Sequence, residues 1–271
     1  MDGQIIAVYC MCDDLLRSLH HREDRQVKVR DAEVMTIALV AVLYFGGNFN
    51  LAALFLHEQG YLPQSLSKSR LNRRLHRIKA KFLTLFALLG EHWKELNSSS
   101  IYAIDSFPLS SCDNIRIRRS RRYRGEDYRG YIPSKRRYFY GIRLHLLVTQ
   151  TGQPVEFFLT VGKDNDVSCL DIYDFDLPEG AQVMADKAFT DYELEDVLSV
   201  AGINLKPLRK SNSKRQLPPW ETYLRHLFRK IIETAGSQIS RRFPKSIHAV
   251  TQAGFELKVV LFVLALSFDH L

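Results

Sequence analysis

The stretch Ile101-Tyr-Ala-Ile-Asp105-Ser-Phe-Pro108 ends an apolar run with a single acidic residue. A short run rich in aromatic and β-branched residues predicts a buried strand, so Asp105 is expected at a strand end. The stretch Val183-Met-Ala-Asp186 repeats this pattern, and a later helical stretch carries Glu233. Two strand-end aspartates and a helical glutamate can converge at one edge of a sheet. Carboxylate oxygens are the ligands that Mg²⁺ prefers, so these three residues are candidates for a shared metal site.

The residues between the two acidic strands predict a hairpin. Residues 138–149 and 155–161 are rich in aromatic and β-branched side chains, and the turn at 150–154 joins them. A helix at about 191–201 and a strand at 203–207 follow the Asp186 strand. This order fits an α/β, RNase H-like mixed sheet in which the Asp105 and Asp186 strands are neighbours.

The helix that carries Glu233 is expected to end before Pro244, because proline removes a backbone donor. The spacing of its apolar residues predicts a core face, on which Glu233 does not lie. Glu193, Glu195 and Glu221 are the rival third acids. That core face comprises Leu224, Leu227, Phe228, Ile231 and Ala235.

Residues 1–96 predict an all-α unit that resembles a helix-turn-helix, and the polar linker 97–100 separates it from the strands. We therefore expect two domains, a helical DNA-binding domain at 1–96 and a catalytic domain at 101–271. Within the first, Asp31 is expected to cap a helix that Gly46 and Gly47 end.

Two further helices are expected in this unit. Asn50 is expected to cap a short one that Gly60 ends, and Ser67 to start a third that runs to Leu89. The third helix has a basic face, which a recognition helix would place against DNA. A solvated face of a packing domain is the alternative. The arginines of this face are Arg70, Arg73, Arg74 and Arg77.

A second basic segment follows the Asp105 strand and has tyrosines between its charges. Guanidinium groups match the geometry of phosphates and tyrosines stack on bases, so we expect nucleic-acid contact. A charge run on a solvated face is again the alternative. The basic residues singled out here are Arg118, Arg119, Arg121, Arg122, Arg124, Lys135, Arg136 and Arg137.

The composition of the 271 residues is that of a globular protein, and a formal charge of +8 favours a polyanionic partner. The four cysteines form no CxxC pair, which favours free thiols in a reducing cytoplasm. The most apolar stretch, residues 259–267, is too short to span a bilayer and predicts a buried C-terminal helix. We therefore expect a cytoplasmic protein without a membrane partner. With 30 acidic residues in the chain, Asp105, Asp186 and Glu233 could also be ordinary surface acids.

Several ordered motifs resemble bacterial insertion-sequence DDE transposases, and most closely the insertion-sequence family numbered 982. The resemblance covers nearly the whole chain. Its motifs are Ile104-Asp-Ser-Phe-Pro-Leu109, Tyr138-Phe-Tyr-Gly-Ile-Arg-Leu-His145, Ala185-Asp-Lys-Ala-Phe189, Ile232-Glu-Thr234 and Ile247-His-Ala-Val-Thr251, together with Val29-Arg-Asp-Ala-Glu33 and Ser69-Arg-Leu-Asn-Arg-Arg-Leu-His76.

The resemblance implies a DNA transposase that cuts at the terminal repeats of its element and joins the ends to target DNA. It implies a triad of Asp105, Asp186 and Glu233, two Mg²⁺ ions that Mn²⁺ can replace, and a homodimer on double-stranded DNA. Arg229, one turn before Glu233, would face the DNA phosphate that lies at the triad.

The chain departs from the family at Ala235-Gly236, where a bulky apolar residue and Phe are expected. Glycine within a helix costs about 1 kcal/mol relative to alanine. A catalytically inactive DNA-binding remnant therefore stays open as an alternative. A related RNase H-like nuclease or resolvase without strand transfer is the other one.

Overall fold

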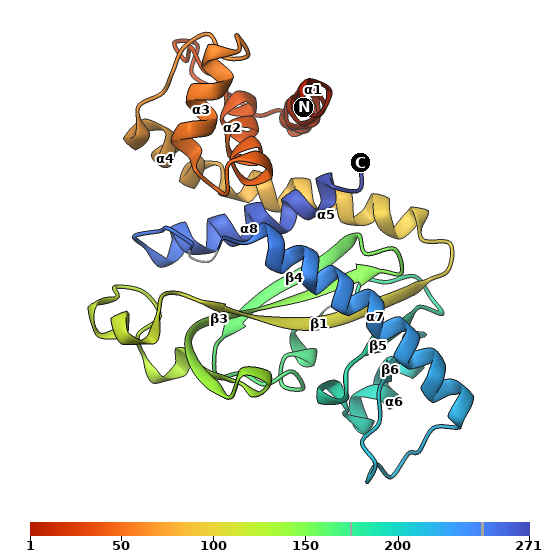
Figure 1. Cartoon of the computed structure of the whole chain (residues 1–271). Coiled ribbons are helices and arrows are strands. Elements are labelled where there is room, and N and C mark those ends of the chain that lie inside the picture. Colours follow the sequence, from red (N-terminus) through yellow and green to blue (C-terminus); the bar gives the residue numbers. More distant parts are fainter. Residues whose placement is uncertain (174, 245–246) are drawn as a thin grey trace. The chain divides into compact units, whose positions relative to one another are not determined.

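The structure of the chain, a computed structural model, describes residues 1–173, 175–244 and 247–271 (Figure 1). Two compact units divide the chain. The first unit comprises Met1–Leu88 and Ile239–Leu271, and the second comprises Leu89–Gln238.

The first unit is helical. Helices α2 and α8 are apolar on nearly all sides and almost every residue in them is buried, so each needs neighbours around its whole circumference. The helices of this unit are α1 (Asp2–Ser18), α2 (Asp31–Tyr44), α3 (Phe49–Glu58), α4 (Lys68–Arg77), the first part of α5 (Lys79–Leu96), and α8 (Gln252–Phe268).

This division differs from the one that the sequence suggests at residues 96–101. The expected buried C-terminal helix is present as α8, but it belongs to the same unit as the N-terminal helices. Lys258 of α8 donates a hydrogen bond to the carbonyl of Gly47, and the ring of Phe262 lies against the same glycine. The apolar surface of α2 thus finds a partner from the far end of the chain.

Three details of these helices correct the expectations. Asn48, not Asn50, caps α3, and its side chain accepts from the backbone N–H of Leu51 at 3.2 Å. Asp31 is the first residue of α2 rather than its cap, and its side chain is buried. The expected third helix is two helices, because Ile78 separates α4 from α5.

The second unit contains a six-stranded mixed sheet in the order β2-β3-β1-β5-β6, with β4 also paired to β3. Strand β1 runs antiparallel to β3 and parallel to β5. The strands are β1 (Ile101–Ser110), β2 (Arg129–Ile132), β3 (Arg137–Thr149), β4 (Pro154–Val161), β5 (Gln182–Ala185) and β6 (Asn204–Pro207). Helix α6 (Tyr192–Val200) connects β5 to β6, and α7 (Pro219–Arg242) follows β6.

The register of β1 and β5 brings the two sequence motifs together. The parallel pairing runs from Ile101 opposite Gln182 to Ile104 opposite Ala185. Asp186 directly follows the end of β5, as expected, whereas the expectation that Asp105 ends its strand is wrong, because β1 continues to Ser110 and Asp105 still pairs with Leu146 of β3. Both acids nevertheless come directly after the last residue pair between β1 and β5. The prediction that these two strands are neighbours is confirmed.

No single helix in the described ranges is long and apolar enough to cross a membrane. Helices α2 and α3 together have sufficient length and apolar composition, but they are bent by 109° relative to each other. The cysteines are free, as expected. Cys12 and Cys169 are buried, whereas Cys10 is exposed.

Candidate active site

Asp105 and Asp186 are held by the backbone that follows them. The N–H of Ser106 donates to Oδ1 of Asp105 at 2.7 Å, and the N–H of Lys187 donates to Oδ1 of Asp186 at 2.7 Å. The local backbone therefore restricts both side chains before any ligand binds.

Burial raises the pKa of Asp105 to about 7. The carboxylates of Asp166 and Asp186 push this pKa further up, while the N–H of Ser106 and the guanidinium of Arg229 lower it. The ionised form of Asp105 thus lies among negative charges that the nearby cations only partly balance. Such an environment favours binding of a further cation.

Helix α7 carries a stripe of charged residues at intervals of four. Arg225 is buried, bonds to Glu221 and donates to the carbonyl of Pro207 at the end of β6. One turn further on, Nε of Arg229 lies 3.0 Å from Oε1 of Glu233. Side chains four apart share one face of a helix, so Glu221, Arg225, Arg229 and Glu233 lie along one side of α7.

Arg229 also connects this stripe to the strand end. Its Nη1 lies 3.9 Å from Oδ1 of Asp186, so one guanidinium contacts both Asp186 and Glu233. The side chains of these two acids are 40% and 61% exposed, which leaves both open to a ligand from solvent. The structure therefore brings the expected strand acids and Glu233 to one region.

The apolar face that the sequence predicts for α7 is wrong where it can be checked. Leu224 and Leu227 are exposed, whereas Arg225 is buried. The other expected members of this face, Phe228, Ile231 and Ala235, have side chains outside the described part of the structure.

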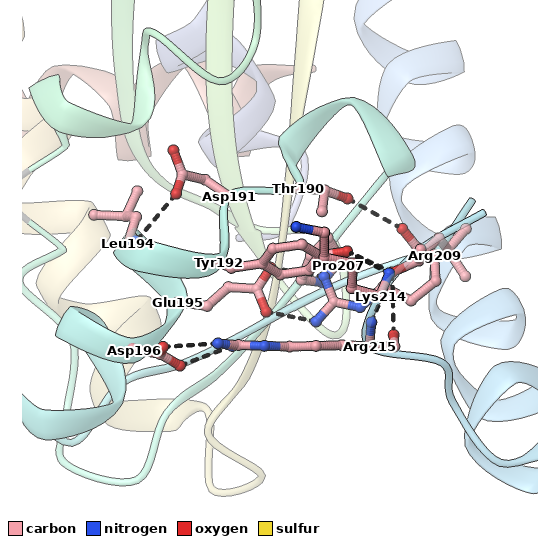
Figure 2. Close-up of polar contacts among 12 residues, drawn as sticks. Thr190, Asp191, Tyr192, Leu194, Glu195, Asp196, Pro207, Arg209, Lys214 and Arg215 are labelled. Atoms are coloured by element: carbon pink, nitrogen blue, oxygen red, sulfur yellow. Dashed lines mark hydrogen bonds and ion pairs between the residues drawn. The ribbon is translucent and has the colours of Figure 1, made fainter. Parts of the chain in front are cut away.

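Two of the three rival acids are committed elsewhere. Figure 2 shows Glu195 of α6 held by the guanidinium of Arg209, a bidentate pair in which both side chains are 8% exposed. Glu221 pairs with Arg225 on α7. Glu193 is exposed at the start of α6, where its N–H donates to Asp191.

Asp166 is an acid of this region that the sequence pattern did not single out. It lies in the loop after β4, and its Oδ1 accepts a hydrogen bond from Oγ of Ser106. Nη1 of Arg143 lies 3.9 Å from the same oxygen. No strand or helix pattern surrounds Asp166, so only its proximity to Asp105 in space could have indicated it.

His145 has a structural role in the sheet. It is buried, its ring stacks on Phe158, and its Nε2 lies 3.0 Å from Oγ1 of Thr160. Burial lowers its pKa to about 4, and the charge of Arg143 acts in the same direction.

The basic segment after β1 is mostly exposed. Its second half includes β2, where Tyr131 pairs directly with Tyr138 of β3 and the two rings lie 5.0 Å apart. Arg122 is partly committed, because it donates to the carbonyl of Ser111 at 2.9 Å. The exposed members are Arg118, Arg119, Arg121, Arg124, Lys135, Arg136 and Arg137.

Helix α4 in the first unit presents its arginines beside a hollow of about 580 Å³. Arg70, Arg73 and Arg77 are exposed. Arg74 differs from the expectation of DNA contact, since its guanidinium bonds to the buried carboxylate of Asp31 and to the carbonyl of Val29.

His21, Glu23 and Asp31 place three ligand atoms within 4.8 Å of one another, a spacing that could suit a metal ion. Arg74, however, contacts both Glu23 and Asp31. Its guanidinium already supplies the positive charge that these acids need, so this cluster functions as an internal ion-pair network.

Comparison with known families decides which chemistry the site belongs to. The family described as "Transposase DDE domain" matches residues 96–246, more than half of the chain. The chain belongs to this transposase family. The matched residues include Asp105, Asp186 and Glu233, together with Asp166. A DDE transposase domain implies dependence on a divalent metal.

A solved structure supports the fold of this transposase family member. The "piggyBac transposase synaptic complex with hairpin DNA" matches with a TM-score of 0.50 and 12% sequence identity, over 97% of this chain and 71% of that one. The comparison with curated proteins finds no match.

Proposed function

We propose that this protein is the transposase of a bacterial insertion sequence, similar to the family numbered 982, and that it acts on DNA in the cytoplasm. It binds the terminal inverted repeats of the element, cleaves the DNA there and joins the ends to target DNA. The observation that carries the proposal is the convergence of Asp105, Asp186 and the Arg229–Glu233 pair in a transposase-family domain.

We assign the mixed sheet to the RNase H-like fold on its topology. A central β1 lies between an antiparallel β3 and a parallel β5, and Asp105 within β1 and Asp186 after β5 come directly after the last pair between these two strands. In this assignment Asp105 and Asp186 are the strand ligands and Glu233 is the helix ligand of two Mg²⁺ ions, which Mn²⁺ can replace. Bound metal would activate the attacking oxygen and stabilise the leaving oxygen of the phosphodiester.

The residues of the site fit such a metal. The acids converge, the pKa of Asp105 is raised by burial and by the charges of Asp166 and Asp186, and the oxygen donors suit a hard cation. Bound metal would neutralise the acids in place of Arg229. The guanidinium of Arg229 would then be available to contact the DNA phosphate. The backbone N–H groups of Ser106 and Lys187 keep the two aspartates oriented.

DNA binding is assigned to the basic surfaces of both units. The exposed arginines of α4, Arg70, Arg73 and Arg77, would read the element ends, and the segment after β1 would contact phosphates generally. The solved piggyBac structure is of a synaptic complex with hairpin DNA. By analogy we propose a homodimer on DNA for this chain.

The test uses linear DNA that carries the inverted repeats flanking the coding region. The full-length protein should nick this DNA at the repeat in Mg²⁺ and produce joined products, and EDTA should stop both. Nicking without joined products would support a nuclease or resolvase instead. Binding without metal-dependent nicking would identify an inactive remnant, in line with Ala235-Gly236.

A further inference from the structure

Asp166 belongs to a series of contacts that runs from Arg143 to Asp105. Arg143 approaches Asp166, Asp166 accepts from Oγ of Ser106, and the backbone N–H of Ser106 donates to Asp105. Both side chains of the first contact are largely buried, at 15% exposure for Arg143 and 21% for Asp166. The loop after β4 is thereby connected to the part of β1 that carries Asp105.

The charge of Asp166 is only partly balanced by Arg143. Their closest oxygen and nitrogen are 3.9 Å apart, beyond hydrogen-bond distance. The same guanidinium also donates to the carbonyls of Gly162 and Tyr131, at 3.3 Å each. A neutral Asn could accept the hydrogen bond from Ser106 without the repulsion that an acid adds beside Asp105. An acid at this position therefore destabilises the metal-free site and favours a cation.

We propose that Asp166 is a positioning residue of the metal site, outside the three expected acids. Through Ser106 it fixes the backbone that orients the Asp105 carboxylate, and its charge strengthens the binding of divalent metal. This inference rests on the proposed metal-dependent function and extends it to a fourth acid. Because Arg143 also donates to the carbonyl of Tyr131 in β2, the same contacts link the basic segment after β1 to the site.

The experiment measures Mn²⁺ binding to the full-length protein by calorimetry and by the electron paramagnetic resonance of free Mn²⁺. Asp166→Asn should weaken binding about tenfold, the lower end of the effect of removing a group that supports metal ligands. Ser106→Ala should weaken it in the same direction, whereas Ser106→Thr keeps the hydroxyl and should bind as the parent does. Asp164→Asn, on the same loop, is the matched control and should have no effect.

A double-mutant cycle separates positioning from a general loss of structure. The cycle uses Asp166→Ala, which removes the acceptor that Asn would keep: if Asp166 acts through Ser106, then Asp166→Ala with Ser106→Ala should lose little more affinity than Asp166→Ala alone. Mn²⁺ binding by Asp166→Asn with parental affinity would overturn the inference, as would full additivity of the two changes. If the parent itself bound no Mn²⁺, the proposed function would fail instead, so the two failures are distinguishable. Should Asp166→Asn not fold, Ser106→Ala against Ser106→Thr tests the same contact.

Discussion

Nε of Arg229 lies 3.0 Å from Oε1 of Glu233, one turn further along α7. The same guanidinium reaches toward Asp186, so this helix pair is linked to the end of β5. That link distinguishes Glu233 from the acids of α6, of which Glu195 is neutralised by Arg209. The positive charge of Arg229 therefore lies beside the same acids that a bound metal ion would neutralise.

Asp105→Asn and Asp186→Asn should each abolish DNA cleavage while leaving DNA binding nearly unchanged. Loss of a metal ligand removes several kcal/mol of transition-state stabilisation, so we expect a rate reduction of about a thousandfold or more. The measurement is cleavage of repeat-containing DNA in Mg²⁺, with binding followed by gel shift. The control is Asp196→Asn, because Asp196 lies on α6 and forms an exposed ion pair with Arg215. Near-parental cleavage by either site variant would remove that residue from the site.

Glu233→Gln should lose cleavage to a similar extent, and Glu193→Gln should not. Both glutamates are exposed helix residues of the second unit, but only Glu233 is linked to Asp186 through Arg229. Cleavage assays on the two variants in parallel check the assignment. If Glu193→Gln were the inactive variant, Glu233 would be an ordinary solvated acid and the two-aspartate part of the site would stand alone.

Metal binding should depend on pH because the pKa of Asp105 is raised to about 7. A carboxyl with a raised folded pKa stabilises the metal-free fold below its unfolded pKa of about 4, and that contribution is lost as pH rises through 7. Bound metal replaces the proton, so its apparent affinity should rise about tenfold between pH 6 and pH 8. Thermal unfolding with and without Mg²⁺ across this range should show a larger stabilisation at pH 8. Asp105→Asn should flatten the dependence, and a parental stabilisation independent of pH would contradict it.

Asp31→Asn should destabilise the first unit by about 3–5 kcal/mol, because Arg74 would keep its buried position without its main partner. Although burial raises it, hydrogen bonds from His21 and Arg74 hold the pKa of Asp31 below its usual value. The stability from this carboxylate is therefore present above about pH 4 and is lost as pH falls through the folded pKa. Denaturant unfolding between pH 3 and 7 measures both effects. Arg70→Gln, on the exposed face of α4, should change stability by no more than about 0.5 kcal/mol.

The sheet could be predicted because its signals are local. The apolar runs at 101–105 and 183–186 have strand composition, and the helix between 191 and 201 forces a parallel crossover to the next strand. The parallel pairing of β1 and β5 ends at Ile104 and Ala185, so the next residues, Asp105 and Asp186, are neighbours even though β1 itself continues to Ser110. The adjacency of Asp105 and Asp186 follows from the expected strand order, in which these two strands are neighbours.

The parts that could not be predicted depend on contacts distant in sequence. Asp166 lies in a loop without periodicity, and only its hydrogen bond with Ser106 marks it. The spacing of Leu224 and Leu227 predicts a core face on α7, yet these two side chains are exposed and Arg225, which pairs with Glu221, is buried instead. Arg74 belongs to the same run of basic residues in α4 as the exposed arginines. Nothing in the neighbouring sequence indicates that its guanidinium would pair with Asp31.

The two basic surfaces should make separable contributions to DNA binding. Gln substitutions at Arg70, Arg73 and Arg77 should reduce the preference of the full-length protein for element ends over random DNA, because these exposed side chains belong to the candidate recognition helix. Gln substitutions at Arg118, Arg119 and Arg121 should weaken binding to both DNAs alike. Each lost phosphate contact should reduce the slope of log affinity against log salt by about one unit. Competition gel shifts at several salt concentrations distinguish the outcomes. Equal binding of end DNA and random DNA by the parent would refute the recognition role of α4, and an unchanged salt slope in the second set would refute the phosphate role of the segment after β1.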